Sequence, residues 1–106
     1  MTIMNAEISS CMLYKSEGWY WWEMRILFEN GTGTNVVKCI SDGNTSNVVR
    51  PSVAMMLKIM DVTDSYCLDE IQGKYVRVEL DDTERISKIM HIIKPIELIY
   101  SDYDCD

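Results

Sequence analysis

This 106-residue chain has little histidine, the side chain most often used for proton transfer in enzymes, and no closely spaced cysteines. It contains one histidine, His91, and no Cys-x-x-Cys pair, which is the usual mark of half a zinc site. The acidic run Asp81-Asp82-Thr83-Glu84 supplies oxygen ligands but lacks the spacing and the glycine of a calcium loop. We therefore expect a protein that holds neither a metal nor another cofactor.

Long apolar runs are also missing. No stretch reaches the ~20 apolar residues that a membrane-spanning helix needs, and residues 1–7 lack the basic start and apolar block of a secretory signal. We therefore expect a cytoplasmic protein. In that compartment its four widely spaced cysteines are predicted to stay free thiols; they are Cys11, Cys39, Cys67 and Cys105.

Phosphate-binding patterns are weak. The only Gly-x-Gly, at Gly31-Thr32-Gly33, joins two predicted strands and opens no helix, so the amide cradle of a dinucleotide site is missing. Backbone amides around glycines can still form an anion nest, which leaves nucleotide binding by this loop as an alternative. His91 falls on the same face of a predicted strand as Ile89 and Ile93, which favours a partly buried structural position over a catalytic one.

The residues that are present predict one folded domain. With 47% hydrophobic and 25% charged residues, the chain is too apolar for a disordered acidic tail. Alternation of apolar and polar residues predicts a strand over 4–12 with Met4, Ala6, Ile8, Ser10 and Met12 on one face. Further strands are predicted at 19–29, 36–40, 75–80 and 86–93, with a short edge segment at 96–100.

One good helix follows the polar loop 43–47, which we expect to be mobile. Pro51 suits a first helical position, and Val53, Met56, Leu57 and Met60 recur at helical spacing. The methionines Met55, Met56 and Met60 could form a binding surface, but core packing is favoured. A single helical turn is expected around 68–71.

These elements predict an α+β domain over residues 1–100. Its twisted antiparallel sheet would have five to six strands, in the order β-β-β-α-β-β, with one helix packed on one face. Residues 101–106 would form a poorly ordered acidic tail.

The tryptophan-rich segment Trp19-Tyr20-Trp21-Trp22 is the most unusual local feature. In a strand, Tyr20 and Trp22 point to the core while Trp19 and Trp21 point outward. Glu17 precedes this segment and Glu23 and Glu29 follow it, which disfavours base stacking on a nucleic acid. Trp19 and Trp21 are therefore interpreted as protein-interface anchors, unless another element covers them.

The net negative charge comes entirely from the second half of the chain. Residues 1–60 carry five basic and five acidic side chains, whereas residues 61–106 carry five basic and twelve acidic ones, which gives the net charge of −7. The acids concentrate at Asp81, Asp82 and Glu84, and again at Asp102, Asp104 and Asp106. In an extended tail, alternate carboxylates lie about 6.5–7 Å apart, close to the phosphate repeat of a nucleic acid. Nucleic-acid mimicry and ordinary solvated charge both remain open.

Several segments resemble small, functionally unassigned proteins encoded by bacteriophages and prophages. They are residues 3–8, 31–43, 54–60, 68–78 and 89–93, of which Leu68 to Val78 is the most characteristic. The resemblance covers most of the chain, but its motifs form the fold and carry over no catalytic residue. It implies an accessory phage protein, a group that includes inhibitors of bacterial defence such as anti-CRISPR proteins.

Three functional hypotheses follow. The first is a non-enzymatic inhibitor that binds a host protein with a basic nucleic-acid-binding groove, such as a CRISPR effector. It would use the acidic turn, the acidic tail and the anchors Trp19 and Trp21, contact neither nucleic acid nor membrane directly, and could form a homodimer. The second is an oligomeric protein that sequesters nucleotides or other small ligands in pockets formed by loops 31–34 and 43–47. The third is a small hydrolase that uses His91 and a cysteine.

Overall fold

The chain folds around a six-stranded antiparallel sheet and one main helix. In this computed structural model, residues 1–41 and 50–103 are described, so the predicted mobile loop 43–47 lies outside the described residues. The elements are β1 (Thr2–Ser16), β2 (Trp19–Phe28), β3 (Gly33–Ser41), α1 (Arg50–Val62), α2 (Leu68–Ile71), β4 (Tyr75–Leu80), β5 (Ile86–Met90), β6 (Glu97–Ile99) and the 3-10 helix η2 (Tyr100–Tyr103). The predicted α+β class and the predicted number of strands agree with this architecture.

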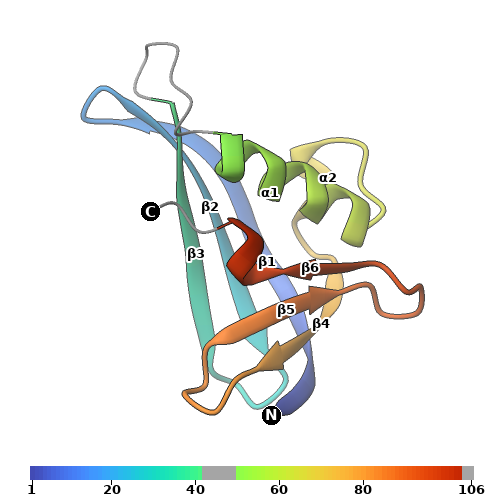
Figure 1. Cartoon of the computed structure of the whole chain (residues 1–106). Helices are drawn as coiled ribbons and strands as arrows, with labels where there is room; N and C mark the ends of the chain where they lie inside the picture. The colour runs from blue at the N-terminus through green and yellow to red at the C-terminus, as the bar shows by residue number, and fades with distance from the viewer. Residues whose placement is uncertain (42–49, 104–106) are drawn as a thin grey trace.

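The sheet is strongly curled. Its strand order is β3-β2-β1-β4-β5-β6, and β1 is the long central strand that pairs with β2 on one side and β4 on the other. Figure 1 shows β4, β5 and β6 running across the long strands β1 to β3. The two ends of the sheet, β3 and β5–β6, therefore come to face each other. Helix α1 contacts β3, β6 and η2 and so covers one end of the curled sheet.

Helix α1 packs on a different face from the predicted one. Its fully buried side chains are Met55, Ile59 and Val62, whereas Leu57, placed in the core by the sequence pattern, is 54% exposed. The actual stripe is rotated by about one residue, roughly 100° around the helix. Both stripes are apolar, so docking on the sheet decides between them. The preference for core packing of the methionines is confirmed, because Met56 and Met60 also pack against the core.

A β-bulge in β1 reverses its alternation. Ile8 pairs with Ile26, but the next pair is Ser10 with Arg25, so Ser9 is an extra residue in β1. After the bulge Cys11 packs against the core, while Met12 is 45% exposed. The prediction that Met12 shares the buried face of Ala6 and Ile8 was therefore wrong.

The hairpin between β1 and β2 is tighter than predicted. The strands predicted at 4–12 and 19–29 leave a longer connection, but β1 continues to Ser16 and only Glu17 and Gly18 form the turn. Both have positive φ, 55° and 81°, which fits the right-handed twist of a two-residue hairpin.

The start of the predicted tail is folded. Residues 100–103 form η2, and Tyr103 is partly buried against the core. The expectation of a poorly ordered, extended segment is therefore wrong for residues 101–103, while residues 104–106 lie outside the described part. Within the described part of the chain, no helix is both long enough and apolar enough to cross a membrane.

Candidate functional site

The acidic turn, residues 81–84, is held in shape by its first carboxylate. Asp81 Oδ1 accepts hydrogen bonds from Thr83 N (2.8 Å), Thr83 Oγ1 (2.7 Å) and Arg85 N (3.0 Å). The backbone closes the same turn, with Asp81 N donating to Arg85 O (2.8 Å) and Glu84 N donating to Asp81 O (3.0 Å). The hydrogen bonds from Thr83 and Arg85 lower the pKa of Asp81. Asp81 therefore builds the turn.

The other two carboxylates of the acidic turn face solvent. The Asp82 side chain is 94% exposed and lies 3.6 Å from the Met1 amino group. Glu84 is exposed, adopts a positive φ of 63°, and takes part in no ion pair among residues 1–41 and 50–103. Two carboxylates, Asp82 and Glu84, are thus presented on a closed backbone frame.

The remaining predicted acidic site residues are not aligned as expected. Asp102 is exposed on η2, where the backbone is helical, so it does not begin an extended row of carboxylates. Asp104 and Asp106 lie outside the described residues.

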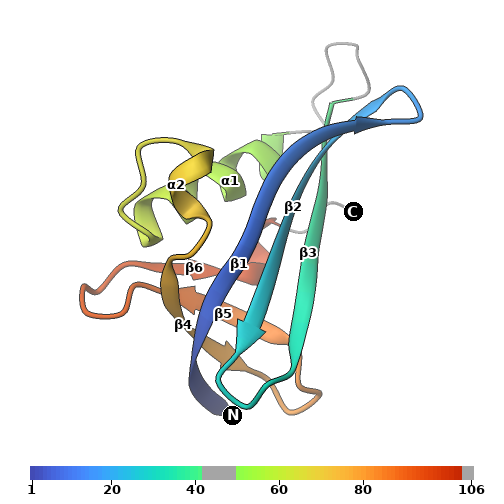
Figure 2. The same cartoon turned by 180° about the vertical axis from the view of Figure 1, so that it is seen from behind.

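Four other acids of the C-terminal half lie away from the acidic turn, whereas Glu79 of β4 lies two residues before it. Asp61, Asp64, Asp69 and Glu70 belong to the end of α1, its connection to α2, and α2 itself. Both overall views place this region away from the β4–β5 turn (Figures 1 and 2). The negative charge of the described C-terminal half is therefore divided between separate places.

Trp19 and Trp21 point outward from β2, as predicted. Trp19 is 46% exposed, and Trp21 is half-buried with its Nε1 donating to Ser16 O at 3.4 Å. Both line an open groove of about 460 Å³, which we call the aromatic groove. Its main walls are Tyr14, Trp19, Trp21, Val37 and Cys39.

Sequence reasoning missed Tyr14 and Val37 as neighbours of the tryptophans. The sheet register brings them there, because Trp21 pairs with Tyr14 on one side and with Cys39 on the other. Placing the hairpin turn at 17–18 would have revealed the first of these pairs.

The aromatic groove and the acidic turn lie at opposite ends of β1. Ser16 at one end pairs with Trp19, while Thr2 at the other end pairs with Leu80, directly before the acidic turn. Figure 2 shows the β1–β2 hairpin and the β4–β5 turn at opposite ends of the molecule. The predicted binding residues therefore form two separate groups, one aromatic and one acidic.

His91 is fully engaged in internal hydrogen bonds. Its side chain is 14% exposed, and Nε2 lies 2.9 Å from Asp64 Oδ2. Its Nδ1 accepts hydrogen bonds from Ile93 N (2.9 Å) and Lys94 N (2.8 Å), so the ring hydrogen sits on Nε2 and points at Asp64. These bonds form a turn that ends β5 at Met90, three residues earlier than predicted. They favour the structural interpretation of His91.

The cysteines and Asp64 fit the same interpretation. Cys11, Cys39 and Cys67 are free thiols, as predicted, and Cys105 lies outside the described residues. Burial raises the pKa of the Cys11 thiol, which disfavours the reactive thiolate. Hydrogen bonds from His91 and Lys94 lower the pKa of Asp64. In the described ranges, no three His, Cys, Asp or Glu side chains gather as a potential metal site.

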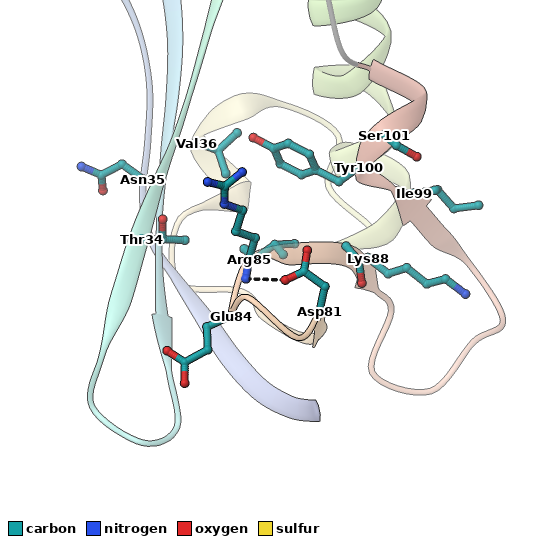
Figure 3. Close-up of a pocket in the computed structure, with 12 residues that line it drawn as sticks. Thr34, Asn35, Val36, Asp81, Glu84, Arg85, Lys88, Ile99, Tyr100 and Ser101 are labelled. Atoms are coloured by element: carbon teal, nitrogen blue, oxygen red, sulfur yellow. Dashed lines mark hydrogen bonds between the residues drawn. The ribbon is translucent and has the colours of Figure 1, made fainter. Parts of the chain in front are cut away.

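A cleft of about 590 Å³ lies between the two facing ends of the sheet (Figure 3). One wall is the start of β3, from Thr34 to Val36, and the other is formed by β5 and η2. Arg85 and Tyr100 line it and were not singled out from the sequence. Only Thr34 belongs to a loop that had been considered for ligand binding. No local pattern predicts this cleft, because it depends on how the sheet curls.

Comparisons with known proteins assign no family. No protein-family model matches the chain, and a search of curated proteins finds no significant match.

Proposed function

We propose that this protein is a non-enzymatic, phage-type inhibitor that binds a host nucleic-acid-handling defence complex, such as a CRISPR effector. The acidic turn is its main contact and occupies part of the basic groove that otherwise holds nucleic acid. In this proposal the protein acts in the cytoplasm of the bacterial host and contacts neither nucleic acid nor membrane itself. The resemblance to phage accessory proteins supports the same class of function.

The construction of the acidic turn is the observation that carries the proposal. Three hydrogen bonds to Asp81 Oδ1 fix the turn before any partner arrives, so Asp82 and Glu84 lose little backbone freedom on binding. Their exposed carboxylates complement the lysine and arginine side chains that line a groove for phosphates. A partner long enough to follow β1 would also reach the aromatic groove, where Trp19 and Trp21 offer large apolar surfaces.

The test begins with capture and ends with displacement. The full chain is immobilised, incubated with lysates of bacteria that express defence complexes, and washed in low and high salt. Each retained protein is identified and purified, and its complex with a fluorescently labelled duplex is titrated with the inhibitor. We expect displacement of the duplex at low salt, weakened at high salt because exposed charges are screened within about 10 Å at 0.1 M ionic strength.

Two double variants separate the acidic turn from general acidity. Asp82→Asn/Glu84→Gln should weaken displacement by about tenfold or more, because it removes both presented carboxylates. Asp61→Asn/Asp69→Asn changes the net charge by the same amount at exposed positions near α1 and α2, and should leave displacement within about twofold. Equal losses for both variants would show that overall charge is responsible. A captured partner that keeps its nucleic acid would contradict the proposal.

A further inference from the structure

The cleft between the sheet ends has the size and the lining of a small-molecule site. Its volume of about 590 Å³ lies inside the range of roughly 300–1,000 Å³ typical of such sites. Its apolar part includes Val36, which is buried, and Ile86, which is half-buried. Thr34 and Ser101 add hydroxyl groups from opposite walls.

Arg85 supplies a positive charge in this cleft. Figure 3 shows its side chain extending between β3 and η2, beside Val36 and toward Tyr100. The guanidinium takes part in no ion pair with any described residue. A guanidinium presents forked donors that match an oxyanion in two parallel hydrogen bonds. This arginine is therefore well suited to an anionic ligand.

Tyr100 brings an aromatic ring and a second cation to the same place. The Lys38 amino group lies 5.1 Å from the centroid of the Tyr100 ring, within the range of a cation–π contact. This contact places a second positive charge next to the ring. The cleft thus combines an oxyanion-binding group with an apolar and aromatic wall, which suits a flat molecule that carries an acid group.

The acidic residues at the cleft limit how much negative charge it accepts. Asp81 Oδ1 is already bonded to three donors, and Glu84 extends away from Arg85 in Figure 3. Lys88 also lines the cleft but pairs with Glu97 at 3.6 Å. One oxyanion can therefore meet Arg85, while additional phosphates would approach the carboxylates of the acidic turn.

We infer that this cleft binds a small planar ligand with a single oxyanion group, of the size of a nucleoside monophosphate or an aromatic carboxylate. Arg85 binds the oxyanion, and the planar body lies along Ile86 and Tyr100. This inference goes beyond the proposed inhibitor function, because its ligand is held by Arg85 rather than by the carboxylates of the acidic turn, although Asp81 and Glu84 also line the cleft.

The test uses the isotopically labelled full chain and follows its backbone amide signals by NMR. The probes are 5′-AMP, ATP, adenosine, inorganic phosphate and benzoate. We expect 5′-AMP or benzoate to shift the amides of Thr34, Arg85 and Ser101. Adenosine and inorganic phosphate should bind at least about tenfold more weakly than 5′-AMP, since adenosine lacks the oxyanion and inorganic phosphate lacks the planar body. ATP should bind more weakly than 5′-AMP because of its extra charge.

Variants then identify the oxyanion-binding group. Arg85→Gln should weaken binding of the preferred probe by about tenfold or more, equivalent to about 1.4 kcal/mol of binding free energy. Arg85→Lys keeps the positive charge but lacks the forked donors. Its affinity for the preferred probe should therefore lie between that of Arg85→Gln and that of the wild type. Arg77→Gln, an exposed arginine of β4 outside the cleft, is the matched control and should bind normally.

Clear outcomes would overturn the inference. They are no shift with either 5′-AMP or benzoate, equal binding of adenosine and 5′-AMP, shifts that map away from the cleft, or equal losses for Arg85→Gln and Arg77→Gln. Preference for 5′-AMP over benzoate would assign the natural ligand to the phosphate class, and the reverse to the carboxylate class. Circular dichroism of each variant checks that the fold is retained.

Discussion

The two hairpin turns at opposite ends of β1 are built in different ways. The turn after β1 consists of Glu17 and Gly18, which both adopt positive φ, and it is shaped by backbone conformation. The turn after β4 is shaped by a side chain, because Asp81 Oδ1 gathers three hydrogen-bond donors. The first turn closes an apolar ribbon that carries the aromatic groove, and the second presents two carboxylates.

This difference shows how a small domain can place two kinds of contact surface at separate ends. Apolar contact needs exposed area, which the long strands β1 and β2 provide beyond the main core. Electrostatic contact needs charges held in place, which the Asp81 hydrogen bonds provide. Since β1 joins both ends, neither surface requires a second domain. The turn that His91 forms after β5 is an intermediate case, shaped by a side chain but presenting no free charge.

The largest expected effect concerns the neighbouring tryptophans of β2. Trp22 is fully buried, and its Nε1 lies 3.3 Å from Cys11 Sγ, whereas Trp19 is 46% exposed. We expect Trp22→Ala to lower the free energy of unfolding by about 3–5 kcal/mol, and Trp19→Ala to change it by about 0.5 kcal/mol or less. Urea denaturation followed by circular dichroism measures both. A large loss for Trp19→Ala would show that its ring belongs to the core.

His91 should have a moderate effect on stability. His91→Ala leaves the backbone N–H groups of Ile93 and Lys94 without their acceptor, so we expect a loss of about 1–3 kcal/mol in the free energy of unfolding. His91→Asn offers a side-chain oxygen and should recover part of the loss. The same urea denaturation measures both variants. If His91→Ala unfolds like the wild type, the turn does not depend on this ring.

The smallest expected effect is a change in pH dependence at the acidic turn. The pKa of Asp81 is lowered in the folded state, so the stability from its carboxylate is present above the unfolded value of about 3.9. It is lost as the pH falls through the folded value. Asp81→Asn keeps a side-chain acceptor but cannot titrate. Its melting temperature should therefore fall less steeply below about pH 4 than that of the wild type.

Asp82→Asn provides the control for this measurement. It lies in the same acidic turn but leaves the hydrogen bonds of Asp81 in place, so the steep wild-type dependence should persist. Thermal melts across the acidic range compare the three proteins. Identical slopes for Asp81→Asn and the wild type would mean that the Asp81 bonds do not couple to folding.

Local patterns predicted much of the fold. Alternation along β2 correctly assigned Trp22 to the core, although Tyr20, placed on the same face, is 40% exposed, and the short helical turn at 68–71 was placed correctly. These features depend on neighbours within a few residues. The two outward-facing tryptophans were found for the same reason.

Features that depend on distant parts of the chain were missed. Ser9 and Ser10 are both small and polar, so the alternation reads through the bulge without a break. Helix α1 is apolar on two adjacent stripes, and only its contact with the sheet selects Met55 over Leu57. The alternate aspartates suggested an extended tail, whereas the spacing of Tyr100 and Tyr103, three residues apart, matches the 3-10 helix that forms. The cleft has no sequence signal at all.

The single extra residue in β1 has a consequence for the far end of the hairpin. If Ser9 took a regular place in the ladder opposite Arg25, the strand would keep its original phase, and Tyr14 would turn to the face of Ala6 and Ile8 while Leu13 turned to the other. One residue of added length thus sets which way every later side chain of β1 faces. The pairing of Tyr14 with Trp21 in the aromatic groove therefore depends on the bulge at Ser9, several residues away.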